Sequence, residues 1–74
     1  MSVAYGGYEL RSLSRELGNG RFSVGVGISR VVDGDRRSAT FQDSENQAML
    51  LRSEAEHESI ALGKRLVDRA LVGF

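Results

Sequence analysis

The single histidine is the first residue to consider for chemistry, because imidazole is the commonest general base near neutral pH. On a helix with 100° between residues, His57 falls on the polar side together with Glu54 and Glu58. Catalysis would also require a nucleophile and an orienting group around a shared cleft, and no spacing in the chain supplies them. We therefore assign no catalytic residue, interpret His57 as a solvated side chain, and predict that the protein is not an enzyme.

Two short patterns look like ligand sites but lack the remaining ligands. Asp33-Gly34-Asp35 offers two carboxylates, whereas a calcium loop needs further oxygen ligands at alternate positions and a closing glutamate. Gly25-Val26-Gly27 lacks the third glycine and the strand-to-helix context of a nucleotide-binding fingerprint. The absence of cysteine excludes a thiolate metal site. We predict no metal and no cofactor, and interpret residues 33–35 as a hairpin turn.

The last third of the chain has the pattern of one long amphipathic helix, from Ser53 to about Leu71. Ser53 and Glu56 form the S-x-x-E capping box, although a second such pair upstream allows a start near Glu45. The apolar arc covers nearly half of the circumference, which suits a helix lying flat on a sheet. Small residues at positions 55, 59 and 63 lie within this arc and predict close approach to a sheet or to a partner helix.

The first two thirds read as strands. Alternation begins at Tyr8, is clearest over residues 22–32, and returns over residues 36–42; Asn19-Gly20 is a strong hairpin signal. We predict an α+β fold, with three antiparallel strands in a meander and one C-terminal helix on one face. A short fourth strand near residues 48–51 is an alternative. Residues 1–74 form one small domain, with residues 1–5 expected to be disordered.

The middle strand has an unusual second face, made of glycine and serine with arginines around it. Two glycines inside a strand weaken it and mark a bulge or a close approach. Three interpretations remain open: an interface with a second copy, a shallow pocket for a small polar or anionic ligand, or a twisted strand facing water. The candidate interface residues are Ser23, Gly25, Gly27, Ser29, Arg21, Arg30 and Arg36 on the strands, with Ser59 and Gly63 on the helix.

Charge argues against a dedicated nucleic-acid-binding protein. Ten basic residues balance ten acidic ones. Residues 1–42 carry six arginines against four acids, and residues 43–74 carry four cations against six acids. A phosphate-binding domain usually has a strong positive excess. We therefore favour a non-enzymatic interaction or adaptor module with an unknown protein partner, and keep a nucleic-acid-binding accessory protein that uses arginines of the strand half as the alternative.

Length and composition suggest where and how the protein works. A chain of 74 residues buries a thin core, and it has no disulfide to reinforce it. We therefore expect a homo-oligomer, most simply a dimer. The start of the chain has neither the basic nor the apolar region of a signal peptide, and no stretch has the length of a membrane span. The expected location is the cytoplasm, without membrane association.

Three segments carry a resemblance to known proteins: Tyr8-Glu9-Leu10-Arg11, the alternating residues 20–30, and Ser53-Glu54-Ala55-Glu56 leading into residues 61–68. They resemble a group of small uncharacterised bacterial single-domain proteins that have a strand-rich first half, an S-E-A-E helix start and a G-[KR]-R-x-[IV]-D ending. Residues 63–68 match that ending in full, whereas residues 43–50 are longer than the pattern. The resemblance implies a sheet-plus-helix fold in a bacterial cytoplasm, and no activity.

Overall fold

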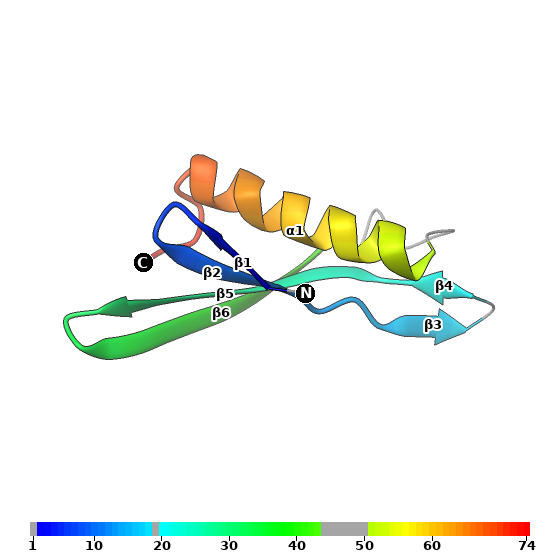
Figure 1. The fold of residues 1–74 in the computed structure, drawn as a ribbon, viewed down its shortest axis with the longest axis horizontal. Coiled ribbons are helices and arrows are strands. Elements are labelled where there is room, and N and C mark those ends of the chain that lie inside the picture. Colours follow the sequence, from blue (N-terminus) through cyan, green and yellow to red (C-terminus); the bar gives the residue numbers. More distant parts are fainter. Residues whose placement is uncertain (1, 19, 44–50) are drawn as a thin grey trace.

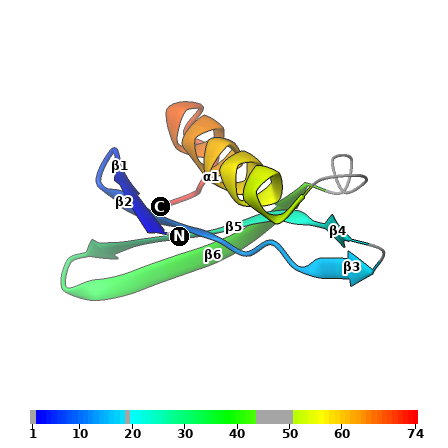
Figure 2. The same ribbon diagram turned by 45° about the vertical axis from the view of Figure 1, so that its right-hand side comes forward.

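The computed structural model describes residues 2–18, 20–43 and 51–74 of the chain. Within them the elements are β1 (Ser2–Tyr5), β2 (Tyr8–Ser12), β3 (Glu16–Gly18), β4 (Arg21–Phe22), β5 (Val24–Val32), β6 (Asp35–Asp43) and α1 (Arg52–Asp68). An antiparallel sheet has the order β1-β2-β5-β6, and β3 and β4 form a second sheet. Helix α1 lies across one face of the larger sheet (Figures 1 and 2). The predicted α+β fold with a C-terminal helix packed on antiparallel strands is confirmed.

Two tight turns set the register of the larger sheet. Gly6 and Gly7 connect β1 to β2, and Asp33 and Gly34 connect β5 to β6 as predicted. All four residues have positive φ, at 57°, 85°, 51° and 82° in chain order. Positive φ at both central residues defines the type I′ turn, whose twist matches that of the strands it joins. Because β5 and β6 pair without a bulge, they form a continuous ribbon of nine residue pairs.

The sequence predicts a meander of three strands, whereas the larger sheet has four. Ser2–Tyr5, expected to be disordered, forms β1 and pairs with β2 along its whole length. Val3 and Tyr5 pack against the core, and this contact accounts for the order of so short a strand. Of the alternative strand near residues 48–51, residues 48–50 lie outside the described part, and Leu51 precedes the helix.

The chain that begins at Tyr8 forms two separate strands, β2 and β3. The amide of Leu13 still donates to the carbonyl of Gly25, at 2.9 Å, before the chain leaves the larger sheet. Ser23 then holds the departing segment: its amide donates to the Arg15 carbonyl at 2.8 Å, and its hydroxyl accepts from the Arg15 amide at 2.9 Å. The predicted turn at residues 19–20 joins β3 to β4, although Asn19 itself lies outside the described residues.

The helix begins one residue before the predicted start and is capped differently. Leu51 is the N-cap, and its amide donates to the Oε1 atom of Glu54 at 3.2 Å. Glu54 thus makes the reciprocal contact that Glu56 was expected to make with Ser53. The helix ends at Asp68, before the predicted end near Leu71, and the chain then turns so that Val72 and Phe74 return to the core.

The core lies between α1 and the strands, as the sequence predicts. Leu10, Val26, Ile28, Ile60 and Val72 form its buried centre. Phe41, Leu62 and Leu66 are partly buried and pack against this centre, so the apolar side of the helix does cover the phenylalanine-bearing face of the sheet. Each fully buried aliphatic side chain of this size contributes about 1.5–3 kcal/mol to folding.

The β1–β2 hairpin is also fastened to the far end of the helix. The Tyr5 hydroxyl donates to Oδ1 of Asp68 at 2.7 Å, and Lys64 Nζ lies 5.5 Å from the centre of the Tyr5 ring. This hydrogen bond, together with burial and the negative charge of Asp68, raises the pKa of Tyr5 above 10.0. These contacts hold the hairpin against the helix, so the hairpin covers part of the core.

Candidate functional site

The glycine and serine face of β5, predicted as an exposed interface, is covered by the chain itself. Ser23 is 2% exposed and Ser29 6%, and Gly25 and Gly27 are buried as well. A Cβ atom at Gly27 would lie 3.3 Å from Cδ1 of Leu13 and 3.5 Å from Nη2 of Arg11. Within the chain these candidate interface residues are therefore buried and do not form an open surface.

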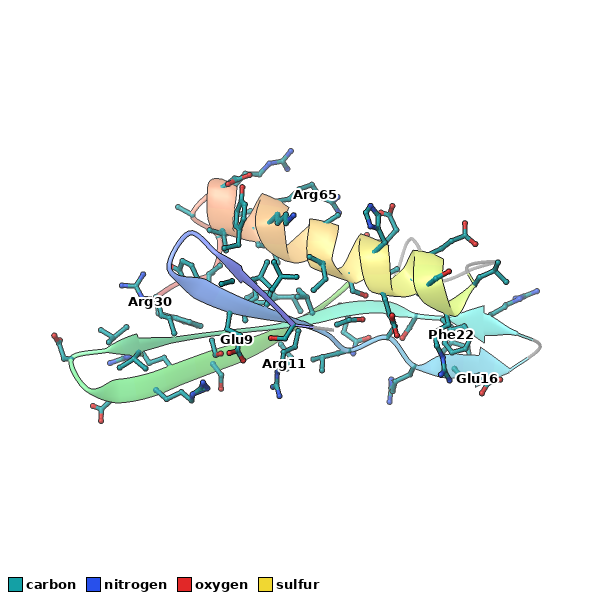
Figure 3. All side chains as sticks on the ribbon, viewed as in Figure 1. Glu9, Arg11, Glu16, Phe22, Arg30 and Arg65 are labelled. Carbon is teal, nitrogen blue, oxygen red and sulfur yellow. The ribbon has the colours of Figure 1, made fainter. Side chains whose placement is uncertain are left out.

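The cover comes from β2 and the residues that follow it. Arg11 points away from α1 (Figure 3) and, with Leu13, lies over the middle of β5. At Gly25 the neighbours are backbone: a Cβ atom there would lie 3.4 Å from the Phe41 carbonyl oxygen and 3.6 Å from that of Leu13. The glycines therefore provide room for neighbouring segments of the same chain, which is one of the uses expected of glycine in a strand.

The two helix residues of the predicted interface are buried in the contact between α1 and the sheet. Ser59 is completely buried, and its hydroxyl accepts a hydrogen bond from the Gly25 amide at 3.1 Å. A Cβ atom at Gly63 would lie 3.0 Å from Cγ2 of Val26 and 3.2 Å from Leu10. Of the two alternatives for the small-residue positions, close approach to a sheet is the one that the structure shows.

The three arginines of the predicted interface do not share a face. Arg30 lies on the helix side of the β5–β6 ribbon (Figure 3), where its Nη1 donates to the Tyr8 hydroxyl at 3.0 Å. Arg36 is exposed and pairs with Val31, one position along the ladder, so it belongs to the opposite face. Arg21 lies in β4 of the smaller sheet. These three charges therefore do not form one basic rim.

The surface that stays available is the outer edge of β6. This strand ends the sheet, and in the described part of the chain β5 is its only strand neighbour. The edge is also long: β6 has nine residues, whereas β1 at the opposite end of the sheet has four. Six of its nine residues are exposed, and Ser38, Thr40 and Gln42 are among them.

The hairpin geometry determines which backbone groups β6 directs outward. In a two-residue hairpin the residues next to the turn form a hydrogen-bonded pair, and such pairs then alternate along the ladder. With Val32 opposite Asp35, the residues that bond to β5 are therefore the odd-numbered ones. The residues of β6 whose amide and carbonyl groups point away from β5 are Arg36, Ser38, Thr40 and Gln42.

Contacts on the other side of β5 agree with this alternation. Gly25 is opposite Gln42, so its own backbone groups should point away from β6. Its carbonyl accepts from the Leu13 amide, and its amide donates to the Ser59 hydroxyl, both on the side of β2 and the helix. The sequence already contains a signal for this edge, because the last strand of a meander lies at the edge of the sheet.

A shallow groove of about 480 Å³ lies beside β6 on the side of β2, opposite to the open edge. One wall is the segment that leaves β2, and the other is β6. Its lining consists of hydroxyl, amide, guanidinium and one aliphatic group, with no acidic side chain; the residues are Ser12, Leu13, Ser14, Arg15, Thr40 and Gln42. Thr40 and Gln42 therefore belong both to the groove and to the open edge.

The residues considered for chemistry are spread over different elements. His57 is exposed on α1, Asp33 lies in the turn between β5 and β6, and Asp35 is the first residue of β6. Among the described residues, no three His, Asp or Glu side chains are placed to hold a metal ion together. No helix in the described part is both long and apolar enough to cross a membrane.

Comparison of the chain with protein-family models, with curated proteins and with solved structures finds no match. The resemblance to small bacterial proteins therefore stays a prediction from the sequence. Any functional conclusion has to come from the geometry of the chain, and the open edge of β6 is the feature with the most definite geometry.

Proposed function

We propose that this protein is a non-enzymatic interaction module that binds an extended segment of a partner along the open edge of β6. The single observation behind this proposal is an exposed nine-residue edge strand with four residues that direct their backbone groups outward. Addition of a strand to such an edge is a common mode of protein recognition, in which main-chain hydrogen bonds supply affinity.

The protection of the two sheet edges supports this function. Proteins usually protect an exposed edge with a short strand, a bulge, a proline or charged side chains. At the opposite end of the sheet, β1 is short. On β6 the charged residues lie near the two ends, and residues 38–42 contain no charge and no proline and keep an unbroken register with β5. This stretch has the properties of a docking site.

The alternative function, binding of nucleic acid through arginines of the strand half, has no specific observation in its favour. Arg30 is engaged with Tyr8 on the helix side, whereas Arg36 lies on the other face. A single-stranded nucleic-acid platform would also need exposed aromatic side chains on which bases stack. Phe41 packs against the core, and Phe22 lies 5.3 Å from the Arg52 guanidinium. This alternative remains an untested prediction.

The docking edge can be tested with a probe that offers little besides a main chain. A capped heptapeptide of alternating threonine and valine should slow amide hydrogen exchange at Ser38, Thr40 and Gln42, because these amides then donate to the peptide. The inward-facing amides of Arg37, Ala39 and Phe41 serve as internal controls, since they already donate to β5. Exchange at residues 38, 40 and 42 that is as fast as in an unfolded chain, both without peptide and at millimolar peptide, would contradict the proposal.

Proline substitutions provide a matched pair of variants. Proline removes an amide donor, so Thr40→Pro loses only an outward-facing group, whereas Ala39→Pro loses a bond of the β5–β6 ladder. We expect Thr40→Pro to remain folded by circular dichroism and to lose peptide binding, and Ala39→Pro to lose folded structure. A folded Thr40→Pro variant that binds the peptide normally would show that the edge is not the docking surface.

A further inference from the structure

We infer that the partner of the β6 edge is a second copy of this chain, paired antiparallel about a two-fold axis at Thr40. This inference rests on the proposed docking function of β6 and adds the identity of the partner and the register. A two-fold related pair of edge strands must run antiparallel, and opposite residues must both direct their backbone groups into the junction. On β6 these are the even-numbered residues, so only registers that place even residues opposite even residues are allowed.

Charge eliminates most of the allowed registers. A pair centred on Ala39 places Asp35 opposite the partner's Asp43, and one centred on Arg37 places two arginines opposite each other. Like charges directly opposite destabilise a strand pair. A pair centred on Ser38 places Asp35 opposite the partner's Phe41, which would desolvate a carboxylate beside an apolar ring.

The register centred on Thr40 places complementary residues opposite each other from residue 37 to residue 43. Thr40 is opposite the partner's Thr40, and Ser38 is opposite the partner's Gln42, so polar groups that can exchange hydrogen bonds meet. Arg37 is opposite the partner's Asp43, a pair of opposite charges that the symmetry repeats once. The Asp43 carboxylate has two oxygens and accepts from this guanidinium in addition to any contact within its own chain.

The apolar positions of the strand also benefit from this register. Phe41 packs against the core but remains only half-buried, and Ala39 beside it is half-buried too. In the Thr40-centred pair each Phe41 lies opposite the partner's Ala39, so the aromatic ring covers a small residue across the junction. Because even residues meet even residues, both helices lie on the same face of the joined sheet. The thin core of each chain is thereby extended across the pair.

The chain contains no cysteine, which allows the register to be read by disulfide formation. In the full chain, Thr40→Cys should form a covalent dimer on mild oxidation, because opposite residues of paired strands lie at distances that a disulfide spans. Ser38→Cys alone should crosslink poorly. A mixture of Ser38→Cys and Gln42→Cys should crosslink efficiently, since these two positions face each other only between chains. The unsubstituted protein should have twice the 8.1 kDa mass of one chain by light scattering.

Four outcomes separate this inference from the proposed function. Efficient crosslinking by Thr40→Cys and by the Ser38 and Gln42 mixture, with a dimeric mass, supports the register. A dimer in which Ser38→Cys crosslinks by itself better than Thr40→Cys overturns it. A protein that stays monomeric at high micromolar concentration also overturns it, and if the heptapeptide still protects residues 38, 40 and 42, the docking function stands with a different partner. Loss of both dimerisation and peptide protection overturns both proposals.

Discussion

The hydroxyl of Ser59 accepts a hydrogen bond from the buried amide of Gly25 at 3.1 Å and donates one to the carbonyl of Ala55 at 2.7 Å. The Leu13 amide still donates to the Gly25 carbonyl, but the acceptor for the Gly25 amide is this helix side chain and not a strand carbonyl. The contact joins α1 directly to the backbone of β5. It explains why a polar residue lies in the middle of the apolar arc of the helix.

Ser59→Ala should therefore destabilise the protein more than its small change in volume suggests. The substitution leaves the Gly25 amide buried without an acceptor, which costs about 1–3 kcal/mol. Urea denaturation followed by circular dichroism measures this loss. Ser53→Ala, on the exposed side of the same helix, serves as the control and should stay within about 0.5 kcal/mol of the parent protein. Equal stability of both variants would mean that the Gly25 amide has another acceptor.

Gly63 should tolerate alanine better than leucine. A Cβ atom at this position meets Val26 at 3.0 Å and Leu10 at 3.2 Å, so even a methyl group requires these side chains to shift. Alanine recovers about 1 kcal/mol of helix propensity, which offsets part of the crowding. Leucine adds three more carbons to a filled space and should be less stable than alanine by roughly 1–3 kcal/mol. Thermal unfolding that ranks leucine equal to or above alanine would contradict this packing.

Local patterns were sufficient for the elements that carry their own signals. Alternation and the Asp33-Gly34 turn predicted β5 and β6, and the 3.6-residue period predicted α1. Strand β1 was missed because four residues have too short a pattern to recognise, even though Gly6-Gly7 is a turn signal. Its order comes from tertiary contacts of Val3 and Tyr5, which a local pattern does not contain.

The candidate site was only partly predictable for a related reason. Gly25 and Gly27 indicated either a bulge or a close approach, and the sequence did not reveal that Leu13 and Arg11 are the groups that approach them. That depends on where the chain travels after β2. The open edge of β6 follows from the order of the strands, and its outward-facing residues follow from the alternation of hydrogen-bonded pairs in the β5–β6 hairpin. Both depend on the complete topology. The candidate interface residues therefore do not form one surface. Some are buried in β5, some lie in the contact between α1 and the sheet, and the arginines lie on different faces or in the smaller sheet.

The hydrogen bond between Tyr5 and Asp68 should make stability depend on alkaline pH. The pKa of Tyr5 is raised above its ordinary value in the folded protein, chiefly by this hydrogen bond. Folding is therefore favoured while the hydroxyl is protonated, fully below about pH 10, and the contribution is lost as the pH rises through the folded-state pKa.

Thermal unfolding from pH 8 to pH 11 tests this dependence. Tyr5→Phe should melt at a lower temperature than the parent at pH 8, and the difference should shrink as the pH rises. Asp68→Asn retains an acceptor but removes the negative charge, so the pKa of Tyr5 should move back toward its ordinary value in an ultraviolet titration of the phenolate. A difference between Tyr5→Phe and the parent that is constant with pH would contradict the assignment.

The end of the helix offers a stabilising substitution. The Leu71 amide donates to the Leu66 carbonyl at 2.9 Å and the Ala70 amide to the Val67 carbonyl at 3.1 Å, which together form a Schellman motif. Ala70 occupies the left-handed position of this motif with φ of 55°, where glycine is usual. That conformation costs an L-residue roughly 1–2 kcal/mol, and the greater freedom of glycine in the unfolded chain cancels part of the gain. Ala70→Gly should therefore raise the free energy of unfolding by about 0.5–1 kcal/mol.

Ala61→Gly is the matched control for this substitution, because it makes the same chemical change inside the helix. There glycine should lower the free energy of unfolding by about 1 kcal/mol. Parallel urea titrations of the two variants should therefore move the midpoint in opposite directions from that of the parent chain. If Ala70→Gly destabilises the protein as much as Ala61→Gly does, then residue 70 continues the right-handed helix in solution and the chain does not turn back at Asp68 to bring Val72 into the core.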